Sequence, residues 1–398
     1  MTPASVLCLF FVFLVPLAPA GLSLINTGLG RSRSAAHAML ASLCVMAVAA
    51  IAYAAQPLFL RGRVLDGSPA SLTILLQMLS AGMAALIPLS SGADRWRLGP
   101  SCASAALLAG CTYPLFAHWV WGGGWLAQLG AKYGLGDGFL DAGGSSSIQV
   151  VGGLTALSVT WILGPRRGKY AAHGMPAAIP GHDAVIVVFA CFLTWLGWLG
   201  LNAAGAILFT GAEAGRAVLI AVNTTLSAAA AVLVTVAITS ARFGRPDASL
   251  CANGWVGGLV ASSAACAFVT PAAAVAIGLI AGVLVTFSVA YIEWPLSIDD
   301  PGGAISVHAA SGLWGVLAVG LFARPADGVS GQWLAQLVGI ATLVGVVLPL
   351  TYSLNWLLNR FYRQRVAPEG ERQGMDLYEL GAGAYPEFAT HNEEFTQL

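Results

Sequence analysis

Eleven apolar stretches, each about as long as a membrane-spanning helix, recur along this chain of 398 residues. A helix needs roughly 20 residues to cross the hydrocarbon core of a bilayer. Only 9% of the residues are charged, against about 25% in soluble domains. The stretches cover residues 3–29, 38–59, 70–91, 100–121, 147–165, 184–210, 217–240, 254–271, 273–292, 303–323 and 333–358. We therefore expect an all-α membrane protein with eleven transmembrane helices, and neither a nucleic-acid-binding protein nor an ordinary soluble enzyme.

The basic residues predict the orientation of these helices. Thirteen of the 18 Lys and Arg residues fall in alternate loops and in the tail, and five fall in the loops between them. Cytoplasmic loops carry the excess of Lys and Arg. The N-terminus is thus expected outside, with residues 1–360 forming a transmembrane channel domain and residues 361–398 a cytoplasmic tail. Residues 18–20 resemble a signal-peptide cleavage site, but no basic residue precedes the first stretch, which favours an uncleaved helix.

An internal repeat is visible in the sequence. Residues 141–149 align without gaps with residues 300–308 and share an Asp, two Gly and a Ser. Each copy opens an apolar stretch, the fifth and the tenth, so five spans separate the two openings. An odd number of spans reverses the direction of entry. We therefore expect an inverted repeat of five helices plus five, with an eleventh appended, and a pathway near the bilayer midplane where the repeats meet.

Polar residues inside these two stretches are the first candidates for function. Asp141 and Asp300 occupy positions typical of helix N-caps. Gln149 and His308, which are equivalent in the repeat, lie two turns further on. Both are polar groups inside a span, and such groups are functional candidates, although a hydrogen bond between packed helices explains them as well. Neither is anionic, so the pair suits a small neutral solute such as ammonia or water better than a bare cation. Of the six histidines only His308 lies deep in a span, and His37 is expected in a cytoplasmic loop.

Aromatic residues cluster at the outer end of the fourth stretch, where Trp121 precedes three glycines. The face of its ring suits a small cation, whereas anchoring at the membrane interface explains the neighbouring Trp119 and Trp125. In the sixth stretch Trp198 and Asn202 share one helix face. A packing stripe or a pathway accounts equally well for that face.

These segments resemble the ammonium transporter family (Amt/Mep/Rh). The similar stretches are HWVWGGGWLAQLG at 118–130, LGWLGLNAAGA at 196–206, AVNTTLSAAAA at 221–231, IDDPGGAISVHAASGLWG at 298–315 and GMDLYELGAGAYPEF at 374–388. The resemblance implies an eleven-helix subunit, a homotrimer and one narrow hydrophobic pore per subunit. Ammonium would be recruited at an outer aromatic site and conducted past a pair of stacked histidines.

The resemblance also implies roles for particular residues. Trp121 matches the recruitment aromatic, Asp141 the aspartate that supports it, and His308 the second pore histidine. The positions that match inner or supporting residues of the family are Trp198, Asn202 and Ser263.

Several positions depart from the family pattern. The first pore histidine is Gln149 here, and the two gating phenylalanines are Ser80 and Leu201. A serine that helps to bind ammonium is Gly205, and extra sequence stands at 131–140. We expect a looser gate, weaker recruitment and no proton relay between two imidazoles, because glutamine does not take up a proton near neutral pH.

Three hypotheses follow from the sequence. The first is an ammonium/ammonia transporter of the cell (plasma or inner) membrane with an altered pore. The second is a sensor of the same fold with little transport, which signals through its tail to a cytoplasmic regulatory partner. The third is an inverted-repeat transporter of another small solute. The spans hold no nucleophile–base pair and no metal-ligand set, so we expect neither an enzyme nor a cofactor.

Overall fold

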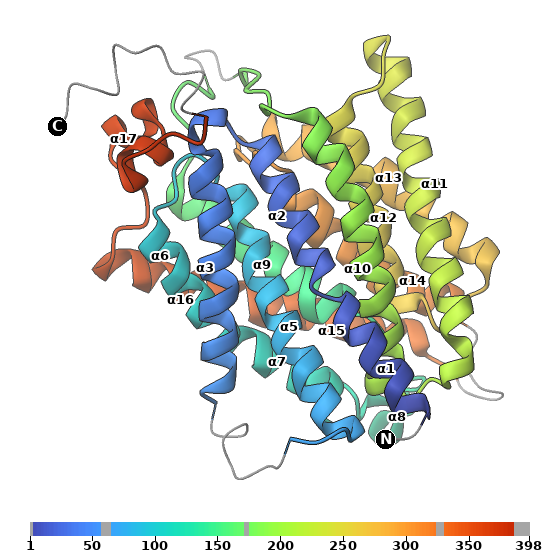
Figure 1. Ribbon diagram of the computed structural model, residues 1–398. Helices are drawn as coiled ribbons and strands as arrows, with labels where there is room; N and C mark the ends of the chain where they lie inside the picture. The colour runs from blue at the N-terminus through green and yellow to red at the C-terminus, as the bar shows by residue number, and fades with distance from the viewer. Residues whose placement is uncertain (1–2, 57–64, 171–174, 324–329, 386–398) are drawn as a thin grey trace.

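The computed structural model describes residues 3–56, 65–170, 175–323 and 330–385. Within these ranges the chain is helical and contains no strand, only isolated bridges such as Trp96 with Arg365. Figure 1 shows long helices running side by side, with α1 and α8 at one end and α17 at the other. The basic residues Arg61, Arg63 and Arg324, and the last part of the tail, lie outside the described residues.

Every predicted apolar stretch coincides with a helix or with helical segments in series. The α-helices are α1 (Pro3–Leu14), α2 (Leu17–Leu29), α3 (Ala35–Ala54), α5 (Pro69–Ser91), α6 (Leu98–Leu107), α7 (Tyr113–Trp121), α8 (Leu129–Tyr133), α9 (Val151–Leu163), α10 (Ala184–Thr210), α11 (Ala217–Phe243), α12 (Ala248–Ala265), α13 (Pro271–Glu293), α14 (Ser311–Phe322), α15 (Gln332–Thr342), α16 (Leu348–Phe361) and α17 (Pro368–Gln373). Short π-helical turns join several of them, including η3 (Ser145–Val150) before α9 and η5 (Ile305–Ala310) before α14.

Local sequence explains where several helices begin. Asp183 accepts a hydrogen bond from the backbone N–H of Ile186 at 2.9 Å, and Asp247 accepts one from Leu250 at 2.8 Å. Both are N-caps, which satisfy donors that the first helical turn leaves free. Thr270 caps α13, and Pro271 occupies the first helical position, where a missing N–H carries no penalty.

Nine helices of the described residues are long and apolar enough to cross a membrane. The two remaining predicted spans are helical as well: α6, the π-helical turn η2 (Leu108–Thr112) and α7 form one, and α12 forms the other. Their mean hydropathy is lower than that of the other nine, because they carry more polar and small residues. Ser262 and Ser263 of α12 are buried against other helices, so this helix does not need an apolar surface. The structure thus shows a multi-pass helical membrane protein.

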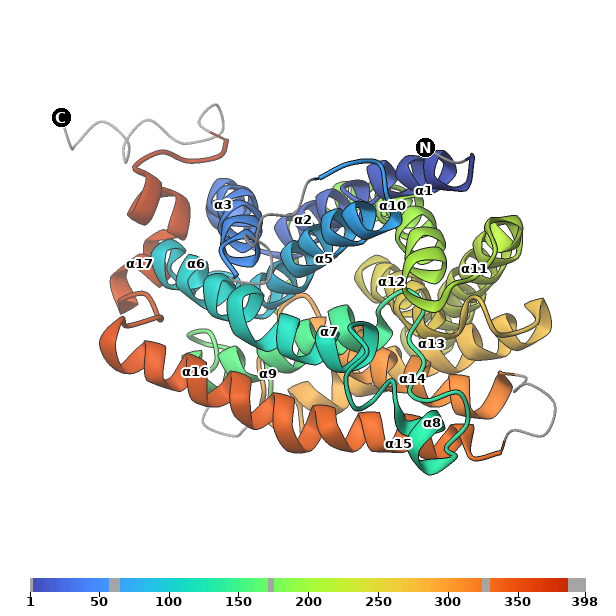
Figure 2. The same ribbon diagram turned by 90° about the horizontal axis from the view of Figure 1, so that it is seen from below.

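The two helices that contain the repeated motif lie in the middle of the bundle. Seen from below, α9 and α14 are enclosed between α5 and α12 on one side and α15 and α16 on the other (Figure 2). They touch each other through glycines. A Cβ on Gly153 would stand 2.4 Å from the backbone nitrogen of Ala309, and one on Gly312 would stand 2.7 Å from the carbonyl oxygen of Ser145. Each helix therefore packs on the opening of the other, which brings η3 and η5 together.

Candidate functional site

A cavity of about 380 Å³ opens near α8, at the end of the molecule opposite α17. Its lining includes Trp121, Asp137, Asp141, Phe209 and Thr210, and we call it the vestibule. The indole N–H of Trp121 donates to the backbone carbonyl of Asp141 at 2.8 Å. Its ring stacks on Phe209 with centroids 3.9 Å apart and planes 9° from parallel. The Trp121 ring is therefore held in place at the cavity wall.

The carboxylate of Asp141 is fully engaged by the start of the η3 turn. It accepts backbone N–H bonds from Gly144 and Ser146 at 2.9 Å and from Ser147 at 3.0 Å, and a further bond from the Ser146 hydroxyl. These contacts cap the turn and complement the positive end of the helix. Asp300 does the same for the other opening, accepting the N–H of Ile305 at 2.7 Å. Both aspartates shape a helix start, and neither presents a free carboxylate to a solute.

Gln149 and His308 form a buried hydrogen-bonded pair where the π-helical turns η3 and η5 meet. Their side chains are joined by a 2.7 Å bond between Gln149 Oε1 and His308 Nδ1. In this arrangement the ring donates from Nδ1, so Nε2 is left as an acceptor. The amide nitrogen of Gln149 has no hydrogen-bond partner in the described part of the chain, although it is completely buried. A donor and an acceptor are thus both available to a small polar solute at this point.

Three further hydroxyls lie buried on elements that pack around Gln149 and have no hydrogen-bond partner at ordinary geometry among the described residues. They belong to Ser80 on α5, to Tyr113 at the start of α7, whose side chain neighbours that of Ser80, and to Ser306 in η5. Unpaired polar groups are costly in a membrane interior, by several kcal/mol each on transfer scales. Ser80 was predicted at the outer gate, whereas Tyr113 was missed, because no spacing in the sequence links it to Ser80.

The candidates of the sixth stretch support the vestibule from α10. Trp198 donates to the hydroxyl of Ser263 at 2.9 Å, and Asn202 donates to the hydroxyl of Thr224 at 2.9 Å. Leu201 is completely buried. Gly205 lies against the opening of the fifth stretch, where a Cβ would stand 2.4 Å from the carbonyl oxygen of Ala142. Phe209 also belongs to this helix and was missed, although it continues the stripe of Trp198 and Asn202 by seven residues.

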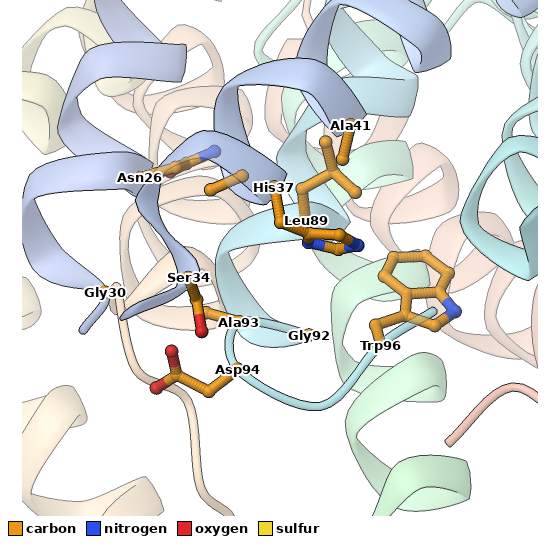
Figure 3. Close-up of a pocket in the computed structure, with 11 residues that line it drawn as sticks. Asn26, Gly30, Ser34, His37, Ala41, Leu89, Gly92, Ala93, Asp94 and Trp96 are labelled. Atoms are coloured by element: carbon orange, nitrogen blue, oxygen red, sulfur yellow. The ribbon is translucent and has the colours of Figure 1, made fainter. Parts of the chain in front are cut away.

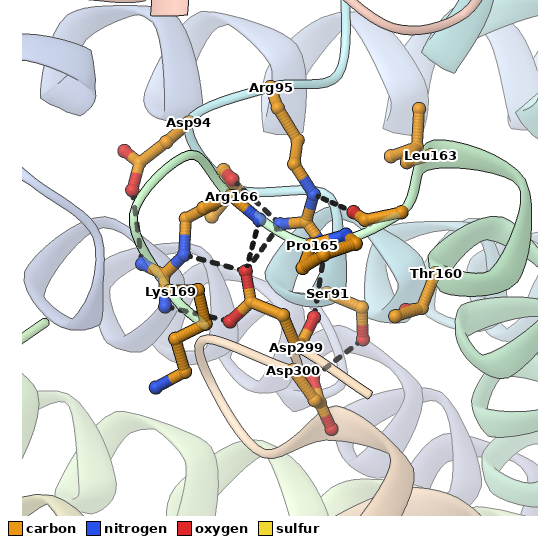
Figure 4. A network of polar contacts seen from close by, with 12 residues as sticks. Ser91, Asp94, Arg95, Thr160, Leu163, Pro165, Arg166, Lys169, Asp299 and Asp300 are labelled. Atoms are coloured by element: carbon orange, nitrogen blue, oxygen red, sulfur yellow. Dashed lines mark hydrogen bonds and ion pairs between the residues drawn. The ribbon is translucent and has the colours of Figure 1, made fainter. Parts of the chain in front are cut away.

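Charged side chains form a network on the loops after α5 and α9 (Figure 4), at the end of the molecule where α17 lies, since Glu371 of α17 accepts the backbone N–H of Arg167. Arg166 holds Asp299 through Nε and Nη2, each at 3.0 Å, and reaches Asp94 at 3.2 Å. Arg95 donates to the carbonyl oxygen of Asp299 at 2.8 Å. Burial lowers the pKa of Arg95 to about 10. Burial alone would raise the pKa of Asp299, but the guanidinium groups of Arg95 and Arg166 hold it below its ordinary value.

The C-terminal segment packs onto this same end. Asp376 accepts the backbone N–H of His37 at 2.7 Å, and Glu379 accepts from the His37 ring and from the backbone of Leu98, both at 2.9 Å. The expectation that His37 lies in a loop is wrong, because it is buried in the first turn of α3. Burial opposes ionisation of Glu379, yet its bonds to His37 and Leu98 keep its pKa below the usual value.

A small cavity lies beside this docking point (Figure 3). It measures about 30 Å³ and is lined by residues of α2, the turn before α3, α3, the end of α5 and the loop after it, including Ser34, His37 and Asp94. This volume suits about one water molecule. It is too small for a route through the protein, so the vestibule and the Gln149–His308 pair remain the candidate site.

A multi-pass helical bundle in which the two motif-bearing helices meet at a buried polar pair has the architecture of a membrane transport protein. The sequence profile of the Ammonium Transporter Family matches residues 58–385, and the chain belongs to this family.

Relatives and solved structures agree with this assignment. The chain is 35% identical to Ammonium transporter Amt2 of Archaeoglobus fulgidus, across 96% of this chain and 88% of that protein. It is 31% identical to the Ammonium transporter of Bacillus subtilis, across 80% and 77%. The structure described as Sensor Amt Protein aligns with a TM-score of 0.87 at 28% identity, covering 94% of this chain and 98% of that one. Candida albicans Mep2 shares the fold, with a TM-score of 0.80 at 24% identity and coverage of 98% and 92%.

Proposed function

We propose that this protein conducts ammonium or ammonia across the cell membrane, along a route from the vestibule past Gln149 and His308. The observation that carries the proposal is the buried Gln149–His308 pair, joined by a 2.7 Å hydrogen bond where the turns η3 and η5 meet. The unpartnered Gln149 amide nitrogen adds a donor there. Ammonia both donates and accepts hydrogen bonds, so it suits such a pair.

The vestibule is the proposed entry point. An aromatic face stabilises a small cation by about 0.5–2 kcal/mol, and Trp121 presents such a ring, backed by Phe209. Beyond it, Gln149 offers no basic nitrogen, so a proton cannot pass between two imidazoles. We therefore propose that any flux past the pair is mainly that of neutral ammonia, with little accompanying charge.

The proposed architecture completes this account. It comprises eleven spans, an N-terminus outside, a cytoplasmic tail from residue 361 and an inverted repeat of five helices plus five. Positive φ angles at the equivalent residues Gly144 and Gly303, and capping by Asp141 and Asp300, support the repeat. We also propose a homotrimer with a pore in each subunit. Small residues on the helix faces permit the close contacts that such an assembly needs.

A second candidate function is ammonium sensing with little transport. The high structural similarity to the Sensor Amt Protein favours it. The docked C-terminal segment supports it too, because Asp376 and Glu379 connect the tail to the start of α3 and to the first residue of α6. A cytoplasmic signalling or regulatory protein would then read the position of the tail. Transport of another small solute is the third candidate, and membership of the ammonium transporter family weighs against it.

Uptake and binding measured on one preparation separate these functions. The purified protein is placed in liposomes for ammonium uptake and in detergent for calorimetric titration with ammonium. Transport predicts uptake above that of empty liposomes, and a sensor predicts binding without such uptake. If the protein neither binds nor transports ammonium but moves another small solute, the proposal is wrong.

A further inference from the structure

The segment of extra sequence between the aromatic run and Asp141 builds one wall of the vestibule. It begins with the short helix α8 and continues through Gly134, Gly136 and Gly138, all at positive φ. Glycine adopts this backbone conformation at little cost, whereas other residues are strained in it. The segment therefore turns back on itself and delivers Asp137 to the lining of the cavity.

Two glutamines of α15 fix this segment in place. Gln332 accepts the backbone N–H of Asp137 at 2.9 Å and donates to the carbonyl oxygen of Gly138 at 2.9 Å. Gln336 accepts the N–H of Leu140 and donates to its carbonyl oxygen, both at 2.9 Å. The backbone on either side of Asp137 is thus bound to a helix of the bundle, which gives its side chain a defined position at the cavity.

Asp137 supplies the free negative charge of the vestibule. Its side chain is exposed, and its carboxylate has neither a hydrogen bond nor an ion pair among the described residues. The other acidic residue of the lining, Asp141, already accepts donors from Gly144, Ser146 and Ser147. Lys132 lies on the same segment but does not line the cavity. A carboxylate that lines the same cavity as the Trp121 ring is the combination that attracts a small cation to that cavity.

We propose that Asp137 is a cation-recruiting residue that raises the local concentration of ammonium at the vestibule. The inference rests on the proposed function, in which ammonium reaches the site as a cation. Asp137 acts through its charge at a distance, so it should speed entry and lower the KM without changing the maximal rate. Its effect should fade with salt, since exposed charges are screened within about 10 Å at 0.1 M ionic strength.

Charge removal with a matched control tests this assignment. Asp137→Asn removes the charge at the cavity, and Glu213→Gln removes an exposed charge from the connection after α10 that does not line it. Asp137→Asn should raise the KM for ammonium about two- to threefold at low ionic strength, and not at about 1 M salt, where the screening length is about 3 Å. Glu213→Gln should leave the KM unchanged. An unchanged KM in Asp137→Asn, or an equal rise in both variants, would overturn the proposal.

A second readout does not depend on ammonium transport. Caesium ions quench tryptophan fluorescence by collision, and the part of the quenching that disappears in Trp121→Leu reports on the vestibule. Asp137→Asn should reduce that part at low salt, and iodide quenching should not fall. If Asp137→Asn reduces the caesium quenching while the wild-type protein shows no ammonium uptake, the transport function is wrong and the recruiting role of Asp137 stands. If the wild-type protein takes up ammonium and Asp137→Asn leaves the caesium quenching unaltered, only the recruiting role of Asp137 is wrong.

Discussion

Individual residues at the vestibule divide into those that hold the site and those that face a solute. Asp141 belongs to the first kind, since its carboxylate is used by the η3 turn. Trp121 does both, because its N–H binds the Asp141 carbonyl while its ring lines the cavity. The sequence could not separate these two uses of Trp121, because they depend on where the segment 131–140 brings Asp141.

Trp121→Leu should weaken ammonium binding by at most about 2 kcal/mol, the upper range of one cation–π contact. Trp121→Phe is the matched control, since it keeps an aromatic face and loses only the N–H bond to Asp141. Calorimetric titration of both variants measures the effect. Equal affinity in wild type and Trp121→Leu would assign the ring to anchoring at the membrane interface.

Restoring a serine at position 205 should damage the protein instead of strengthening recruitment. A Cβ there would stand 2.4 Å from the carbonyl oxygen of Ala142, so the helix opening would have to move. We expect Gly205→Ser to lower the thermal unfolding temperature and to weaken ammonium binding. Gly215→Ser offers a control at an exposed glycine with open surroundings and no positive φ. A Gly205→Ser variant with wild-type stability and tighter binding would contradict this packing argument.

At the scale of elements, the sequence predicted most of the helices, but it did not predict the π-helical turns with which two of them begin. Apolar length located the long helices to within a few residues, because lipid demands that length. The π-helical turns at 145–150 and 305–310 escaped prediction. They arise where two helices press against each other through Gly153 and Gly312, which is a tertiary effect. His37 was misplaced for a similar reason, since the distant Glu379 pairs with it.

The ion network around Asp299 should make stability depend on pH. Asp299 has its pKa below the ordinary value in the folded protein, so it binds a proton less readily than in the unfolded chain. Its stabilisation is therefore present above the unfolded pKa of about 4 and is lost as the pH falls below it. Thermal unfolding measured from neutral pH down to about pH 3 should show a falling midpoint.

Asp299→Asn should remove part of this pH dependence and lower stability at neutral pH by about 3–5 kcal/mol, because Arg95 and Arg166 stay buried and charged. Glu369→Gln is the control, since its pair with Arg372 is largely exposed and exposed pairs contribute little. Equal unfolding midpoints for the two variants would show that the buried network does not stabilise this end.

For the whole molecule, the alignment of residues 141–149 with 300–308 pointed to Gln149 and His308 as a pair, but not to what that pair does. Gln149 and His308 occupy equivalent positions in the sequence alignment, and in the structure their side chains form a hydrogen bond. The buried hydroxyls of Ser80 and Tyr113 near the pair could not be foreseen, because they come from other helices that pack against η3. The orientation of the bundle is a prediction from charge alone.

Labelling of introduced cysteines checks that orientation. In a background without native cysteines, Asp66→Cys should react with a membrane-impermeant maleimide in intact cells. Arg245→Cys should react only after the membrane is permeabilised, because the loop after α11 is predicted to be cytoplasmic. Both native side chains are exposed, so access is not limited by burial. The opposite pattern of labelling would reverse the topology.

The central claim is that Gln149 and His308 lie on the route of ammonia and that Gln149 prevents a proton relay. Ammonium uptake and ammonium-evoked current, recorded together in one liposome preparation of wild type, Gln149→His and His308→Ala, test it most directly. The account predicts uptake with little current in wild type, increased charge movement in Gln149→His, where two imidazoles would face each other, and impaired uptake in His308→Ala. A large wild-type current that Gln149→His leaves unaltered, or a well-folded His308→Ala that transports as well as wild type, would contradict it.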